Sequence, residues 1–283
     1  MGWIDYWCNA FTPDRRALWD ASLAAQGVPL GLRTEADDTF AAADDMVARM
    51  DELDIGTLVL PSCDLPPGAG VTDFETFACR FEEMADLAKR HPGRFVGAFS
   101  IDPGHGIEGV RRAGEALAEN WAVALHYHTH SFDRGFDHRD LYPYYALASE
   151  RGVPVVMQAG TSGGLMPSAC GQPIGIDRPA LYFPDTVFVL SHAGWPWVDE
   201  ACAMAIKFPN VFLGTATQPP RRWSEPLLRF AKGAGRGKLL IGTGFPIAGH
   251  RHTLAQLDAL DVDARTRAAW LGDNAGKVFT RIP

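Results

Sequence analysis

Short runs of apolar residues recur along the chain, and each is followed by a segment with the spacing of a helix. The runs are residues 3–8, 55–60, 95–101, 122–125, 153–157, 186–190, 211–213 and 238–241. None alternates polar and apolar residues as a solvent-facing sheet does, so they predict parallel strands that are covered on both faces. The pattern favours one α/β domain over residues 1–283, a closed (β/α)8 TIM barrel. An open doubly wound sheet is the alternative, weakened because no G-x-G-x-x-G turn follows the first run.

The intervening segments predict helices, with two irregular stretches. Helical spacing or helix-start residues predict helices beginning at Thr34 and Thr72 and helices over residues 106–120, 141–151, 197–208, 226–232, 250–260 and 263–280. Residues 10–33 contain Pro and Gly at several positions and predict irregular structure. Residues 161–176 form a Gly/Pro-rich loop whose length suggests a functional or mobile segment.

Three histidines follow the central apolar run at alternate positions. The run 122–125 predicts a buried strand that leads into His126, His128 and His130. Side chains on a strand alternate between faces, so the three point the same way if the extended conformation continues. The carboxyl ends of barrel strands carry the chemistry of this fold. The histidines are therefore candidates for catalysis or for metal binding.

Composition narrows the class of partner. The chain has 283 residues, 47% of them hydrophobic, and a formal net charge of -8. This charge argues against nucleic acid or an anionic membrane as a partner, and no apolar run reaches the roughly 20 residues needed to span a bilayer. The N-terminus lacks the features of a signal peptide. Five cysteines without a C-x-x-C pair are typical of reduced thiols, so we expect a cytoplasmic protein.

Six further segments share one order along the chain, namely residues 90–97, 141–148, 152–160, 183–185 with 190–194, 207–212 and 240–246. Together they resemble the amidohydrolase-related family, in the branch that includes aminocarboxymuconate-semialdehyde decarboxylase and benzoate decarboxylases. The resemblance implies an amidohydrolase-like barrel, with a divalent metal, often zinc, at the strand ends. It also makes a homodimer reasonable by analogy.

The chain departs from the family's usual metal ligands. The first strand of the family ends in Asp-x-His-x-His, and here Trp7 and Asn9 stand at the two histidine positions. Gln158 replaces the histidine of the fifth strand, and Gly244 replaces the aspartate of the eighth. The resemblance implies that only His192, after the sixth strand, is retained. Because zinc requires about four N, O or S ligands, we expect no metal in the family's usual place.

The remaining polar residues suggest a remodelled pocket. His192 lies at a strand end, where a neutral imidazole can take up a proton near neutral pH, and we expect it to be catalytic together with His126 and His128. The expected substrate-binding residues around them are Trp7, Asn9, Asp64, Gln158, Trp195, Thr243 and Arg222. Core packing is the alternative for Trp7 and Trp195, and solvent exposure is the alternative for Arg222.

Three functional hypotheses follow. The first is a metal-independent lyase, cyclase or hydrolase that acts on a small aromatic or polyketide-like molecule, as in secondary metabolism. His192 with His126 or His128 would move the proton, while Asn9, Gln158 and Thr243 would stabilise negative charge. The second is a catalytically silent barrel that binds a ligand or an active relative. The third is a metal-dependent decarboxylase or hydrolase, with zinc as the cofactor, at a relocated site of His126, His128 and His130.

Overall fold

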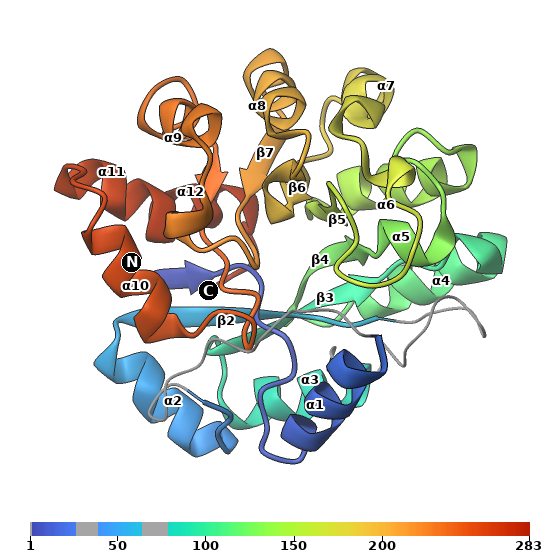
Figure 1. The fold of residues 1–283 in the computed structure, drawn as a ribbon. Helices are drawn as coiled ribbons and strands as arrows, with labels where there is room; N and C mark the ends of the chain where they lie inside the picture. The colour runs from blue at the N-terminus through green and yellow to red at the C-terminus, as the bar shows by residue number, and fades with distance from the viewer. Residues whose placement is uncertain (1, 27–38, 64–78) are drawn as a thin grey trace.

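Eight parallel strands form one sheet in which spatial order follows chain order (Figure 1). The computed structural model describes residues 2–26, 39–63 and 79–283. The strands are β1 (Trp3–Asp5), β2 (Ile55–Pro61), β3 (Phe95–Ser100), β4 (Ala122–Tyr127), β5 (Val155–Gln158), β6 (Phe188–Ser191), β7 (Val211–Gly214) and β8 (Leu239–Leu240). All eight predicted strands are present, and the predicted TIM-barrel class is confirmed.

The segments after β1 and β8 close the sheet into a barrel. The Gly244 amide donates to the Trp7 carbonyl over 2.9 Å, and the Asn9 amide donates to the Phe245 carbonyl over 3.1 Å. Cys8 and Phe245 form an isolated parallel bridge. The first strand therefore ends at Asp5, before the predicted Cys8, but the chain continues beside the segment after β8.

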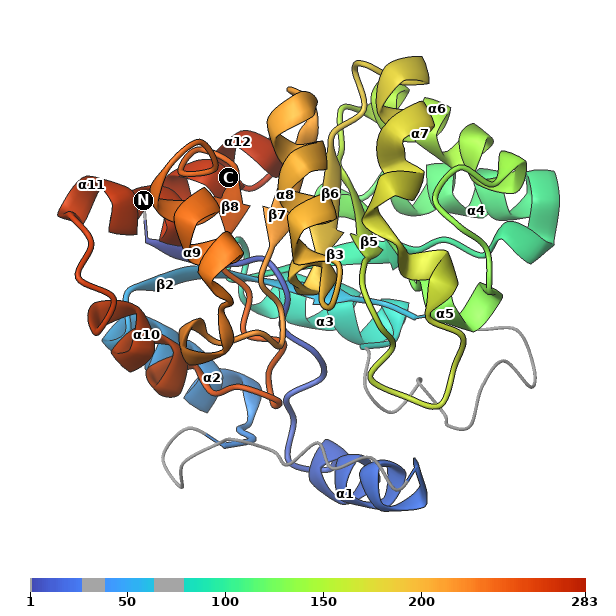
Figure 2. The ribbon, with the colours of Figure 1, turned by 45° about the horizontal axis from the view of Figure 1, so that its top comes forward.

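Helices surround the strands in both views (Figures 1 and 2). Among the described residues they are α1 (Arg15–Gln26), α2 (Ala43–Glu52), α3 (Phe81–Arg90), α4 (Gly106–Ala116), α5 (Thr129–Phe132), α6 (Tyr142–Arg151), α7 (Asp177–Tyr182), α8 (Val198–Lys207), α9 (Glu225–Lys232), α10 (His250–Asp258), α11 (Ala264–Ala268) and α12 (Asn274–Val278). No described helix is both long and apolar enough to cross a bilayer.

Six predicted helices have starts among the described residues, and each start lies within one residue of the observed one. The prediction of irregular structure over residues 10–33 was wrong for Arg15–Gln26, where α1 forms. The helix start predicted at Thr34 and the one at Thr72 both lie outside the described residues. The described parts of those helical segments are α2 and α3, which begin at Ala43 and Phe81.

A tyrosine fills the centre of the barrel. Tyr6 is 1% exposed, and its hydroxyl lies 2.8 Å from the Ser191 hydroxyl oxygen on the far side of the barrel. The same hydroxyl accepts a hydrogen bond from the Ala216 amide over 3.0 Å. A Cβ atom at Gly214 would lie 2.2 Å from the Tyr6 hydroxyl oxygen, so only glycine fits there. Tyr6 therefore links β1 to the ends of β6 and β7.

Candidate functional site

The histidine run does not stay extended. β4 ends at Tyr127, so His126 is its last histidine. His128 has φ -85 and ψ 81, and His130 lies in the short helix α5. The expectation that the three side chains share one strand face was therefore wrong. Alternation between faces stops where the backbone turns into the helix. All three histidines are buried, and neighbouring imidazole centroids are 6.3 Å (His126 to His128) and 6.2 Å (His128 to His130) apart.

His126 has one engaged ring nitrogen and one buried nitrogen without a partner. Its Nδ1 lies 2.7 Å from the Ser62 carbonyl oxygen, just after β2. Its Nε2 is buried and has no hydrogen-bond partner among the described residues. Burial lowers the pKa of His126 from 6.5 to about 4, against a smaller opposing effect of the Ser62 hydrogen bond. His126 is therefore neutral at physiological pH.

His192 lies across the barrel in a comparable state. It follows β6 and has φ 62, a left-handed conformation that non-glycine residues rarely adopt. The residue is partly exposed, but its Nδ1 is buried without a hydrogen-bond partner among the described residues. Burial lowers the pKa of His192 to about 3, with smaller contributions from His130 and His126. An unusual backbone conformation at a strand end is a common feature of functional sites.

Trp7 contacts both histidines. Its ring lies edge-on to His126 at a centroid distance of 4.8 Å and edge-on to His192 at 5.1 Å. The side chain is 3% exposed. Trp7 therefore occupies the point at which the ends of β1, β4 and β6 converge. The predicted catalytic pair and the predicted aromatic wall are brought together there.

Asn9 and Thr243 are engaged in holding the ends of β1 and β8. The Asn9 amide nitrogen donates to the Phe245 carbonyl over 2.8 Å and to the Gly244 carbonyl over 3.3 Å, and its oxygen accepts the Trp7 indole N–H over 3.2 Å. The Thr243 hydroxyl donates to Asp5 Oδ2 over 2.6 Å. Their donors are thus used inside the protein. The expectation that these two residues stabilise negative charge on a substrate is not supported.

The other predicted site residues lie in different surroundings. Gln158, the last residue of β5, is partly exposed. Trp195 is 54% exposed, so the core-packing alternative is wrong for it. Arg222 is exposed at the end of a short turn over Pro220–Arg222. Asp64 lies outside the described residues.

His128 is held by Ser131 of the adjoining helix α5, and His130 is held by the segment that follows β5. The Ser131 hydroxyl oxygen lies 2.6 Å from His128 Nδ1, and burial holds the pKa of His128 well below its ordinary value. His130 Nδ1 lies 3.1 Å from the Pro167 carbonyl oxygen. The 161–176 loop is itself tied down, because the Gly160 amide donates to the Gly171 carbonyl over 2.7 Å. These contacts favour a packed wall over a freely moving lid.

A family model described as amidohydrolase matches residues 4–281, nearly the whole chain. The chain belongs to the amidohydrolase family. Among curated proteins, none matches the sequence. The match confirms the resemblance seen in the sequence.

Several solved structures share the fold of this chain. An uncharacterised TIM-barrel protein from Bordetella bronchiseptica is 20% identical with a TM-score of 0.77, and the alignment covers 100% of this chain and 99% of that one. A 5-carboxyvanillate decarboxylase from Novosphingobium aromaticivorans with bound manganese is 18% identical, with a TM-score of 0.68 and coverages of 98% and 97%. A 2,6-dihydroxybenzoate decarboxylase from Rhizobium is 14% identical, with a TM-score of 0.65 and 99% coverage of both chains. At these identities the likeness shows the fold.

The residues at the usual metal position of the amidohydrolase family do not fit a metal. Trp7 and Gly244 offer no side-chain ligand, and the Asn9 oxygen already accepts the indole N–H. Gly244 has φ 61, and a Cβ atom there would lie 2.5 Å from Thr217 Cγ2 and 2.7 Å from the Thr217 amide nitrogen. An aspartate ligand could enter at this position only if the backbone moved. The packing around Gly244 therefore leaves no room for a ligand side chain at this position.

Restoring the aspartate should not restore a metal site. We expect Gly244→Asp to lower the free energy of unfolding by about 2–4 kcal/mol through the left-handed backbone and the contact with Thr217, without creating a site for Mn²⁺ or Zn²⁺. Gly237→Asp is the matched control, because a Cβ atom there meets nothing within 4 Å. Denaturant unfolding and metal titration calorimetry measure both effects. Near-wild-type stability together with one bound metal per chain would contradict the packing argument.

One described group of side chains does bring possible ligand atoms within 4.8 Å of one another, namely Asp5, Cys8 and His250. The relocated trio of His126, His128 and His130 does not form such a group. Asp5 Oδ1 accepts the Thr243 amide over 2.9 Å, and Asp5 Oδ2 lies 3.2 Å from His250 Nε2. Since both carboxylate oxygens are engaged in joining the two ends of the barrel, we assign this group to barrel closure.

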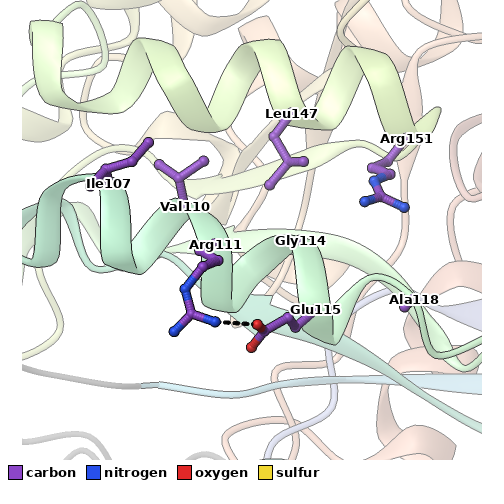
Figure 3. A pocket seen from close by; sticks show the side chains of 8 residues that line it. All are labelled: Ile107, Val110, Arg111, Gly114, Glu115, Ala118, Leu147 and Arg151. Atoms are coloured by element: carbon purple, nitrogen blue, oxygen red, sulfur yellow. Dashed lines mark hydrogen bonds and ion pairs between the residues drawn. The ribbon is translucent and has the colours of Figure 1, made fainter.

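A surface groove of about 600 Å³ lies between α4 and α6 (Figure 3). Ile107, Val110 and Leu147 give it an apolar floor, and Arg111 pairs with Glu115 along its edge. The groove belongs to the outer layer of helices. It contains none of the residues predicted for the site.

Sequence reasoning missed Asp5, Tyr6 and His250. Asp5 could have been found, because it is the acidic residue of the family's Asp-x-His-x-His pattern and remains in place here. His250 opens a predicted helix, and the structure places it at 0% exposure, stacked on Phe245 with a centroid distance of 5.3 Å. Nothing local in the sequence signals that burial.

Proposed function

We propose that this protein is a metal-independent acid–base enzyme, a lyase, cyclase or hydrolase, that acts on a small aromatic or polyketide-like molecule. The observation that carries the proposal is the pair of neutral imidazoles, His126 and His192, in edge contact with Trp7 at the strand ends. Each has a buried nitrogen without a partner among the described residues. A ligand that enters beside Trp7 would supply the missing partner, at the end of the barrel where this fold places its chemistry.

The two imidazoles, Trp7 and Gln158 have different roles in the proposed reaction. A neutral imidazole nitrogen accepts a proton from a bound substrate and can return it in a later step. Trp7 lies between the two rings and fixes their positions. Asn9 and Thr243 position Trp7 and Asp5 and do not face the substrate. Gln158 is left as the amide of the original set that can stabilise developing charge.

Decarboxylation in the manner of the manganese-containing neighbours is a weaker candidate. The neighbour from Novosphingobium is a decarboxylase with bound manganese. The residues of this chain at the usual metal position do not provide a ligand set. A silent barrel remains the alternative from another class, and it predicts binding without turnover.

The test is turnover by the purified protein after dialysis against a chelator. A panel of polyhydroxylated aromatics, β-polyketone mimics and hydroxybenzoates is assayed for loss of substrate by mass. We expect turnover to survive chelation and to fall at least about a hundredfold in His126→Asn and in His192→Asn. His138→Asn, at a partly exposed histidine, is the matched control. Unchanged turnover in the double variant, or activity that appears only with added metal, would refute the proposal.

A further inference from the structure

The site around Trp7 has few hydrogen-bond donors left to offer. The indole N–H of Trp7 is taken by Asn9, both hydrogens of the Asn9 amide face carbonyl groups, and the hydroxyl of Thr243 donates to Asp5. A substrate anion needs donors or cations in its place. These three side chains provide none for it, which leaves the Gln158 amide as the donor assigned above.

His126 is an acceptor by its own geometry. A carbonyl oxygen can only accept, so the 2.7 Å contact with the Ser62 carbonyl places a proton on Nδ1. In a neutral ring the other nitrogen, Nε2, then has a lone pair and no proton. That nitrogen is buried and has no donor among the described residues. A buried acceptor without a donor is costly, and a ligand that supplies one recovers the cost.

The charged groups near the His126 and His192 rings also disfavour an anionic ligand. Within the described residues, burial and the Ser62 hydrogen bond set the pKa of His126, and the charges that act on His192 come from His130 and His126 alone; no lysine or arginine is among them. The histidines themselves are neutral at physiological pH. A carboxylate at this position would be buried beside a lone pair without a cation, which is unfavourable.

We propose that the site recognises its ligand through a neutral hydroxyl that donates to His126 Nε2, and that it therefore takes phenols or enols in preference to carboxylates. The inference rests on the proposed function for the location of the site, and it adds the substrate class. It sets this chain apart from the neighbour whose structure holds manganese and a benzoic acid.

Matched aromatic probes test the proposal. The binding of 2-naphthol, 2-methoxynaphthalene and 2-naphthoate is measured by calorimetry at pH 7, with phenol, anisole and benzoate as a smaller series. The hydroxyl compound of each series is neutral at this pH. We expect the hydroxyl compound of at least one series to bind at least about tenfold more tightly than its ether and its carboxylate, because only it carries the donor.

Two variants test whether the preference for the hydroxyl probe depends on His126 Nε2. His126→Phe keeps a ring and removes the acceptor, so it should abolish the preference, while His138→Phe should leave it intact. Independently of variants, the ¹⁵N resonance of His126 Nε2 in the wild type should move with the hydroxyl probe and not with the ether. Equal binding of the carboxylate or the ether overturns the inference, and so does the absence of His126-dependent binding in both series.

The experiments distinguish failure of the proposed enzymatic function from failure of the proposed hydroxyl preference. A hydroxyl preference that depends on His126, without turnover of any compound in the panel, would support this inference and a silent barrel. Histidine-dependent turnover, combined with equal affinity for the carboxylate probe, would overturn this inference and leave the proposed enzyme standing.

Discussion

Asp5→Ala is expected to lower the free energy of unfolding by about 3–5 kcal/mol. Asp5 is 0% exposed, and it accepts the Trp7 amide, the Thr243 amide and the Thr243 hydroxyl while facing His250 Nε2 at 3.2 Å. Truncation would leave these donors buried without an acceptor at the point where the barrel closes. Chemical denaturation followed by circular dichroism measures the loss.

Two further variants make the Asp5 result interpretable. Asp86→Ala removes an exposed carboxylate that pairs with Arg90, and it should cost less than about 1 kcal/mol. Asp5→Asn keeps the shape but replaces one acceptor oxygen with a donor, so it should fall between wild type and Asp5→Ala. If Asp5→Ala proved as mild as Asp86→Ala, the barrel would not depend on this carboxylate.

Acidification from pH 7 to pH 5 is expected to remove about 2 kcal/mol of stability through His126, and up to about 2 kcal/mol through His192. Burial lowers the pKa of His126 from 6.5 to about 4 and that of His192 from 6.5 to about 3. The unfolded chain therefore takes up protons as the pH falls through 6.5, while the folded protein does not. The contribution of each histidine to the free energy of unfolding is therefore fully present above pH 6.5. It is lost as the pH falls from 6.5 to the pKa of the folded state.

Equilibrium unfolding at pH 7, 6 and 5 measures this dependence. His126→Gln and His192→Gln should each reduce the fall in the free energy of unfolding between pH 7 and pH 5 by the amount given above for that histidine. The double variant should reduce it by the sum of the two amounts. His138→Gln should retain the full drop. A double variant whose stability falls with pH as steeply as the wild type would show that these rings are not held neutral by burial.

The sequence predicted the strands well because a parallel sheet that is covered on both faces leaves continuous apolar runs. The sequence-based prediction was wrong where a contact between distant residues, and not the local sequence pattern, determines the backbone conformation. β1 ends three residues early, and beyond it the amides of Trp7 and Thr243 donate to the Asp5 side chain rather than to a backbone carbonyl. The short helix α5 begins directly after His128 and removes the alternation on which the histidine argument depended.

The candidate site was predicted in part. His126, His192 and Trp7 were expected at the strand ends and meet there. The use of Asn9 and Thr243 as internal links could not be read from the sequence, because their partners come from the opposite end of the chain. His250 is buried against Asp5 for the same reason.

The central claim is that Trp7 and two neutral histidines occupy the place where amidohydrolases hold a metal. Its most direct test is NMR of ¹⁵N-histidine protein, purified without a chelator and titrated with Mn²⁺. We predict that His126 shows a protonated Nδ1 and an unprotonated Nε2 at pH 7, and that substoichiometric Mn²⁺ leaves the His126 and His192 resonances sharp. Selective broadening of both by Mn²⁺ would place a metal beside Trp7 and contradict the account.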